Sequence, residues 1–81
     1  MPDDKGETKF FHVLYDYLHA TWNVKIDDYK TSVFTNKDKD KCIAEAKRLA
    51  QESTAPKRRV LIRGTNGVVL EQVDYDSNLI A

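Results

Sequence analysis

The sequence predicts one α+β domain, in which a single amphipathic helix packs on one face of an antiparallel sheet. Three observations support this class. Short β-rich segments lie within the first 35 residues. One stretch with helical spacing follows, and a hairpin signal then separates two more apolar runs. The predicted order is therefore β-β-β-α-β-β, within a domain at 9–75 that has a flexible N-terminal tail at 1–8 and a C-terminal tail at 76–81.

Three strands are expected before the helix. The segment 10–15 is rich in aromatic and β-branched residues, and a loop follows at 16–21. Residues 22–27 alternate strictly, because Trp22, Val24 and Ile26 face one way and polar side chains face the other. Aspartates at 27 and 28 favour a turn, and residues 31–35 then form a third, short strand.

Helical spacing replaces the period of two after the third strand. Small and apolar side chains recur at intervals of three and four on one stripe: Cys42, Ile43, Ala46, Leu49, Ala50 and Ser53. Thr35, Asn36 and Asp38 are alternative N-caps, and Pro56 ends the helix near Thr54. Because the stripe is rich in alanine, the helix can approach the sheet closely, and aromatic residues of the sheet must fill the core.

The last two strands are expected at 59–63 and 68–73. Between them lies Gly64-Thr65-Asn66-Gly67, and its Asn-Gly pair is a strong hairpin signal. Both residues tolerate the positive φ that a type I′ turn requires. The chain from residue 74 onward reads as a tail, anchored by Tyr75 or by Leu79 and Ile80.

Three segments in this order resemble a known family. They are Trp22-x-Val24-Lys25, the alanine-rich helix 42–50, and Val60-x-Ile62-x-Gly64-x-Asn66-Gly67. The arrangement is similar to that of small bacterial and phage-borne proteins classed as a domain of unknown function. It covers roughly residues 10–75, although Cys42 stands where the family usually has alanine. The resemblance implies a small intracellular ββαββ-type domain and supplies no activity and no catalytic residue.

The overall charge and the apolar content narrow the class of function. Lys plus Arg and Asp plus Glu both number thirteen, which argues against a dedicated nucleic-acid-binding protein with a basic excess. No apolar run reaches the length that spans a membrane, and the first residues carry no apolar signal core. A single cysteine cannot form a disulfide within one chain. These features together predict a cytoplasmic protein.

One acidic motif invites a metal-binding interpretation. Asn36-x-Asp38-x-Asp40 resembles the opening of a calcium loop. However, the sixth position needs glycine and has Lys41, and the twelfth needs glutamate and has Lys47. A helix cap explains the motif far better than a calcium site.

Soft ligands and nucleophiles also lack a functional pattern. His12 and His19 are seven residues apart, without the tight pairs that zinc sites usually show. Cys42 lies on the apolar stripe, where cysteine behaves as a small hydrophobic residue. Neither a nucleophile elbow nor a phosphate-binding glycine loop is present in the sequence. We therefore predict no enzymatic activity, no metal and no cofactor.

One helix can cover only one face of the sheet, although the chain has eight aromatic residues. We expect an apolar strip with basic residues at its rim on the uncovered face, formed by Lys25, Phe34, Arg59, Leu61, Arg63 and Val69. Such a strip would bind a protein partner, or would pair two copies and so support a core that is small for a folded domain.

Nucleic-acid binding is the alternative function. The residues from Lys57 to Arg59, together with Arg63, form a basic cluster among strand aromatics, as in sheet-based nucleic-acid readers. A solvated strand face, whose charges prevent aggregation of the sheet, explains the same cluster without any ligand. The sequence therefore favours a small non-enzymatic module that acts by protein contact.

Overall fold

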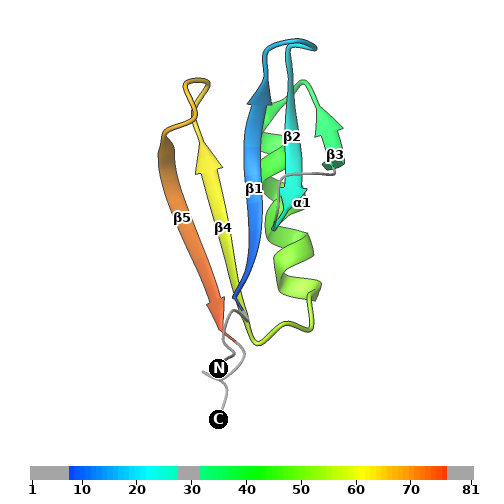
Figure 1. The fold of residues 1–81 in the computed structure, drawn as a ribbon. Helices are drawn as coiled ribbons and strands as arrows, with labels where there is room; N and C mark the ends of the chain where they lie inside the picture. Colours follow the sequence, from blue (N-terminus) through cyan, green and yellow to red (C-terminus); the bar gives the residue numbers. More distant parts are fainter. Residues whose placement is uncertain (1–7, 28–31, 77–81) are drawn as a thin grey trace.

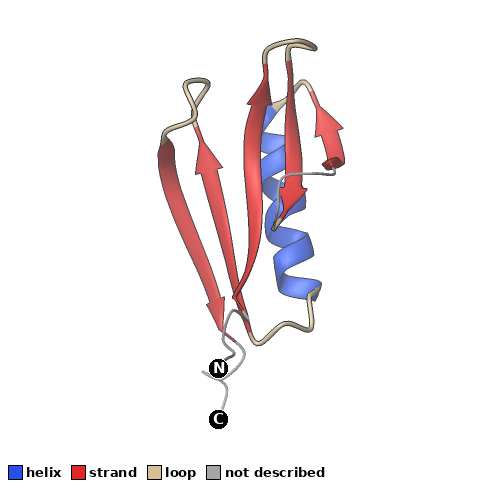
Figure 2. Ribbon diagram, viewed as in Figure 1, coloured by secondary structure: helices blue, strands red, loops and turns tan. Residues whose placement is uncertain are grey.

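The structure is a computed structural model that describes residues 8–27 and 32–76. Its elements follow the predicted order: β1 (Thr8–Asp16), β2 (Thr21–Ile26), β3 (Ser32–Asn36), α1 (Lys39–Glu52), β4 (Lys57–Arg63) and β5 (Val69–Asp76). The α+β class is confirmed, with one helix along one face of a five-stranded sheet (Figure 1, Figure 2). Predictions about residues 1–7, 28–31 and 77–81 lie outside the described residues.

The sheet is mixed, so the expectation of a fully antiparallel sheet is wrong at one pair of strands. The strand order is β3-β2-β1-β4-β5, and β1 pairs in parallel with β4. The other three pairs are antiparallel. Parallel neighbouring strands need a long crossover connection. From β1 the chain passes through β2 and β3, and α1 then carries it across the sheet face to β4.

Two strands are longer than the sequence predicts. Thr8 opens β1 and pairs with Lys57, and Asp76 ends β5 and pairs with the same Lys57. Both residues were expected in the tails. The acidic residues of β5 alternate with Val73 and Tyr75, which pack against the core, so this segment continues the sheet.

The core lies between α1 and the three central strands. The sheet supplies its bulk through Phe11, Val13, Trp22, Val24, Val60 and Ile62. The helix supplies Cys42, Ala46 and Ala50, which are fully buried. The predicted division of roles is confirmed, because small helix side chains allow the close approach and large sheet side chains fill the volume.

Local hydrogen bonds fix both ends of α1. Asp38 is the N-cap, with its carboxylate accepting from Asp40 N at 2.9 Å. Asn36 supports this cap, since its side-chain oxygen accepts from Asp38 N at 2.8 Å. At the other end, Ser53 N donates to Ala50 O at 3.3 Å, and the helix stops before Pro56.

The helix covers only part of the sheet. Its main contacts are with β1 to β4, while β5 lies at the edge of the sheet (Figure 1). The turn between β1 and β2 and the turn between β4 and β5 lie at the same end of the sheet (Figure 1). We call this end, formed by residues 17–20 and 64–70, the hairpin end. The sheet face opposite α1 is called the open face.

Candidate functional site

The open face is built around β1, the central strand. Phe10, His12 and Leu14 point away from the helix, because they alternate with the buried Phe11 and Val13. Strand pairing places further side chains beside them: Asn23 and Lys25 on β2, Lys57, Arg59, Leu61 and Arg63 on β4, and Gln72, Asp74 and Asp76 on β5. Apolar residues thus occupy the middle of the open face, and charged residues flank them.

The structure brings most of the predicted interaction residues together. Lys25, Arg59, Leu61 and Arg63 all lie on the open face. Val69 pairs with Arg63 beyond a β-bulge and is 40% exposed, at the hairpin end.

The prediction for Phe34 is wrong. This residue pairs with Val24 and packs against the core on the helix side. Its neighbour Val33 is exposed instead. Two adjacent apolar residues in a short edge strand do not reveal which one faces the helix, because alternation assigns one to each face.

His12 is the most deeply buried residue of the open face, with 3% of its surface exposed. Lys25 and Leu61 flank it in the strand register. Burial lowers the pKa of His12, and the positive charge of Arg63 lowers it further. Asp27 has the opposite effect and raises this pKa, but by less. The imidazole is therefore neutral at pH 7, and the centre of the open face carries no charge.

A shallow depression lies beside this histidine. It has a volume of about 300 Å³ and is lined by Phe10, His12, Asp27 and Leu61. The rings of Phe10 and His12 are stacked, with centroids 6.1 Å apart, and the Arg59 guanidinium lies 6.0 Å from the Phe10 ring. The depression thus has an aromatic wall, and Asp27 also lines it. The Asp27 Oδ1 accepts from Phe10 N at 3.0 Å, and its Oδ2 lies 4.0 Å from Lys9 Nζ.

Opposite charges on the open face offset one another. Arg59 Nε donates to Asp74 Oδ1 at 2.8 Å, and this bond lowers the pKa of the Asp74 carboxyl. Arg63 donates to Gly67 O at 3.0 Å. Two residues of the basic cluster predicted from the sequence, Arg59 and Arg63, are therefore engaged with neighbouring acceptors, which reduces their capacity to bind phosphates.

The most exposed apolar side chains lie at the hairpin end, which the sequence analysis did not identify. Leu18 is 91% exposed, Tyr17 is 71% exposed, and Val68 and Leu70 are also exposed. Tyr17 and Leu18 occupy a loop without periodicity, so no pattern in the sequence distinguishes them from ordinary loop residues.

Asp16 fixes the turn that carries Leu18. Its Oδ1 accepts from Leu18 N at 2.9 Å and from His19 N at 3.4 Å, and its Oδ2 lies 2.7 Å from His19 Nδ1. The bond to His19 lowers the pKa of the Asp16 carboxyl. Ala20 completes the turn with a φ of 53°. The side chain of Leu18 is therefore presented from an ordered turn.

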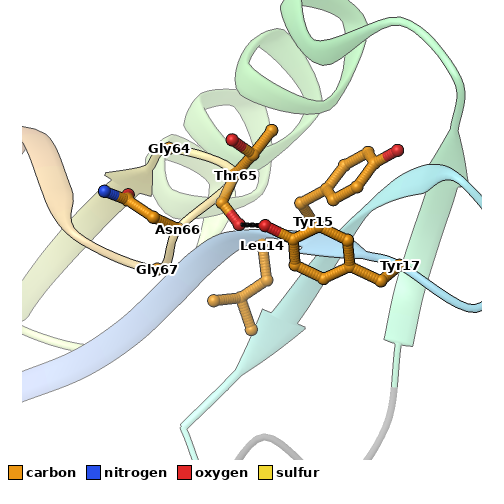
Figure 3. A pocket seen from close by; sticks show the side chains of 7 residues that line it. All are labelled: Leu14, Tyr15, Tyr17, Gly64, Thr65, Asn66 and Gly67. Carbon is orange, nitrogen blue, oxygen red and sulfur yellow. Dashed lines mark hydrogen bonds between the residues drawn. The ribbon is translucent and has the colours of Figure 1, made fainter.

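Tyr17 connects the two hairpins. Its hydroxyl donates to Thr65 O in the β4–β5 turn, and its ring meets the ring of Tyr15 edge-on at 4.9 Å (Figure 3). A pocket of about 230 Å³ lies between the hairpins, lined by Leu14, Tyr15, Tyr17, Gly64, Thr65, Asn66 and Gly67 (Figure 3). The pocket offers aromatic and aliphatic walls together with polar groups of the turn.

Groups considered for catalysis or metal binding have structural roles. Asn36 and Asp38 cap the helix, and the Cys42 thiol is buried and donates to Trp22 O at 3.3 Å. Burial raises the pKa of the Cys42 thiol, which disfavours the reactive thiolate. Among residues 8–27 and 32–76, no three His, Cys, Asp or Glu side chains gather where they could hold a metal ion.

Comparison with protein-family models, with curated proteins and with solved structures finds no match. The part of the chain that the structure describes contains no helix long and apolar enough to cross a membrane.

Proposed function

We propose that this protein is a small non-enzymatic cytoplasmic module that acts by binding another protein, with the hairpin end as its contact surface. The observation that carries the proposal is Leu18, which is 91% exposed on a turn that Asp16 holds in place. Exposed apolar side chains that gather in one patch are typical of interaction surfaces. Leu18 lies in the same hairpin turn as Tyr17, and Val68 and Leu70 are exposed on the other hairpin at this end of the sheet.

The order of the two turns supports this proposal. Association costs free energy when loops must be immobilised, and a turn that is already fixed avoids that cost. The Asp16 hydrogen bonds fix one turn, and the Tyr17 hydroxyl ties it to Thr65 in the other. A partner that fits this end inserts an apolar side chain into the pocket between the hairpins. It also has a recess that accepts the side chain of Leu18.

Comparative capture from an extract of the source organism tests this proposal. Wild-type protein, Leu18→Ser and the matched control Lys41→Ser carry the same tag, and Lys41 is exposed on the helix. We expect a partner that wild type and Lys41→Ser retain equally and that Leu18→Ser retains at least about tenfold less. Equal retention by all three proteins contradicts a contact at the hairpin end.

Weak nucleic-acid binding through the open face is the second candidate. Lys25, Lys57, Arg59 and Arg63 lie on this face, and the Arg59 guanidinium lies over the Phe10 ring, which supports this candidate. Aspartates on the same face and the Arg59–Asp74 bond oppose it. Titration with single- and double-stranded oligonucleotides at low salt decides the matter. This candidate requires binding that weakens steeply with salt and disappears in Arg59→Glu with Arg63→Glu.

We also propose that the chain belongs to the small bacterial and phage family that it resembles. The support is the order of the Trp22-x-Val24-Lys25 strand, the alanine-rich helix and the Asn66-Gly67 hairpin. Membership would add no activity to the function proposed above.

A further inference from the structure

We infer that the open face pairs with the open face of a second copy, about a two-fold axis that runs along β1. This inference rests on the proposal that the protein acts by contact. It uses a different surface and a different partner from the hairpin end, so the two can fail separately.

The centre of the open face is suited to burial between two sheets. Phe10, Leu14 and Leu61 are apolar and half-buried, and His12 is neutral at pH 7 because of its burial. Two sheets that stack face to face bury such a centre in an aligned sandwich about 10 Å thick. A chain of this size has a small core of its own, and an added interface stabilises it by mass action.

The charges beside this centre differ between its two sides. In one row across the sheet, His12 has Lys25 on the β2 side and Leu61 on the β4 side. In the next row, Asp27 N donates to Phe10 O at 2.8 Å on the β2 side, and Arg59 pairs with Phe10 on the β4 side.

A two-fold axis along β1 brings opposite charges together in the row of Phe10 and keeps like charges apart in the row of His12. The rotation places the β2 side of one copy over the β4 side of the other. Asp27 then faces Arg59 of the second copy, and Lys25 faces Leu61 of the second copy. The depression lined by Phe10 and Asp27 receives the guanidinium, which has five N–H donors and uses Nε for Asp74 within its own chain.

The other aligned arrangement is disfavoured by charge. An axis across the strands places β2 over β2 and β4 over β4. With this axis at the level of His12, Lys25 faces Lys25 of the second copy, and Arg59 faces Arg63 of the second copy. Like charges brought together weaken an interface, so the charges oppose this arrangement.

Charge reversal and rescue test this arrangement, with mass in solution measured over a concentration series up to high micromolar. We expect wild-type protein to form a dimer. Leu61→Lys places a cation opposite Lys25 of the second copy and should raise the dimer Kd at least about tenfold. Adding Lys25→Glu to Leu61→Lys creates two opposite-charge pairs across the interface, and the Kd should return toward the wild-type value.

Controls separate loss of contact from loss of fold and from the hairpin end. Each variant is checked by circular dichroism and thermal unfolding, and Lys41→Glu provides the same charge change on the exposed helix surface. Lys41→Glu and Leu18→Ser should both leave the dimer Kd unchanged. A strictly monomeric wild type overturns the inference, as does a dimer that Leu61→Lys leaves intact or Leu18→Ser dissociates. A folded double variant that stays as monomeric as Leu61→Lys overturns the two-fold axis along β1.

Discussion

His12 and Leu18 lie only six residues apart in the sequence, yet their environments are opposite. The imidazole is 3% exposed between Lys25 and Leu61 on the face that α1 does not cover. The leucine is 91% exposed on a turn. Exposure of an apolar side chain costs free energy in an isolated domain. Leu18 is therefore explained more readily by contact with another molecule than by the needs of the fold alone, whereas His12 is buried by its own chain.

The histidine predicts a pH dependence of stability. Because burial lowers the pKa of His12 below its unfolded value, the unfolded chain binds protons more readily than the folded one. Stability is present in full above about pH 6.5 and is lost as the pH falls through the unfolded pKa toward the folded pKa. Lys25 and Leu61 flank the ring in the strand register, and the charges of Arg63 and Asp27 act on it in opposite directions.

Thermal unfolding of dilute protein at about pH 7.5 and about pH 5.5 measures this effect. The Tm of wild type should decrease when the pH is lowered from the higher to the lower of these values, and the Tm of His12→Gln should decrease less. His19→Gln, which keeps the buried ring, should behave like wild type. Equal falls for wild type and His12→Gln would show that His12 titrates alike in the folded and unfolded chain.

At the scale of elements, the strict alternation of apolar and polar residues is the most informative sequence signal for which face of the sheet a residue occupies. Trp22 and Val24 face the helix as predicted, because a half-buried strand fixes its register. Phe34 was misplaced because Val33 beside it is equally apolar. The parallel pairing of β1 with β4 could not be predicted, since alternation reports the face of a residue and carries no information about which strand lies beside which.

The helix start is a further element that the sequence left open among three residues. The structure selects Asp38, so Asp38→Ala should destabilise the protein by about 1 kcal/mol, within a range of about 0.5–2 kcal/mol. Asp38→Asn keeps a side-chain oxygen for Asp40 N and should be close to neutral. Urea unfolding of the three proteins measures the difference. If Asp38→Ala unfolds at the same urea concentration as wild type, the cap contributes no stability.

The small fold presents two separate surfaces, and we propose contact through each of them. The hairpin end gathers exposed apolar residues from two turns that Tyr17 joins to each other. The open face places an uncharged centre between flanking charges of both signs. Of the six residues predicted for the interaction face, four lie on the open face and Val69 lies at the hairpin end. The sequence did not indicate Tyr17 and Leu18, because turn residues far apart in the chain meet only in the folded sheet.

Self-contact through the sheet is the central claim at this scale, and a dilution series of amide NMR spectra tests it most directly. Spectra of isotope-labelled wild-type protein are recorded from high to low micromolar concentration. We predict concentration-dependent shifts at Phe10, His12, Leu14, Lys25 and Leu61, and none at Lys41, Glu45 and Arg48 on the outer surface of α1. Spectra that do not change on dilution, or changes confined to α1, would contradict the pairing of open faces.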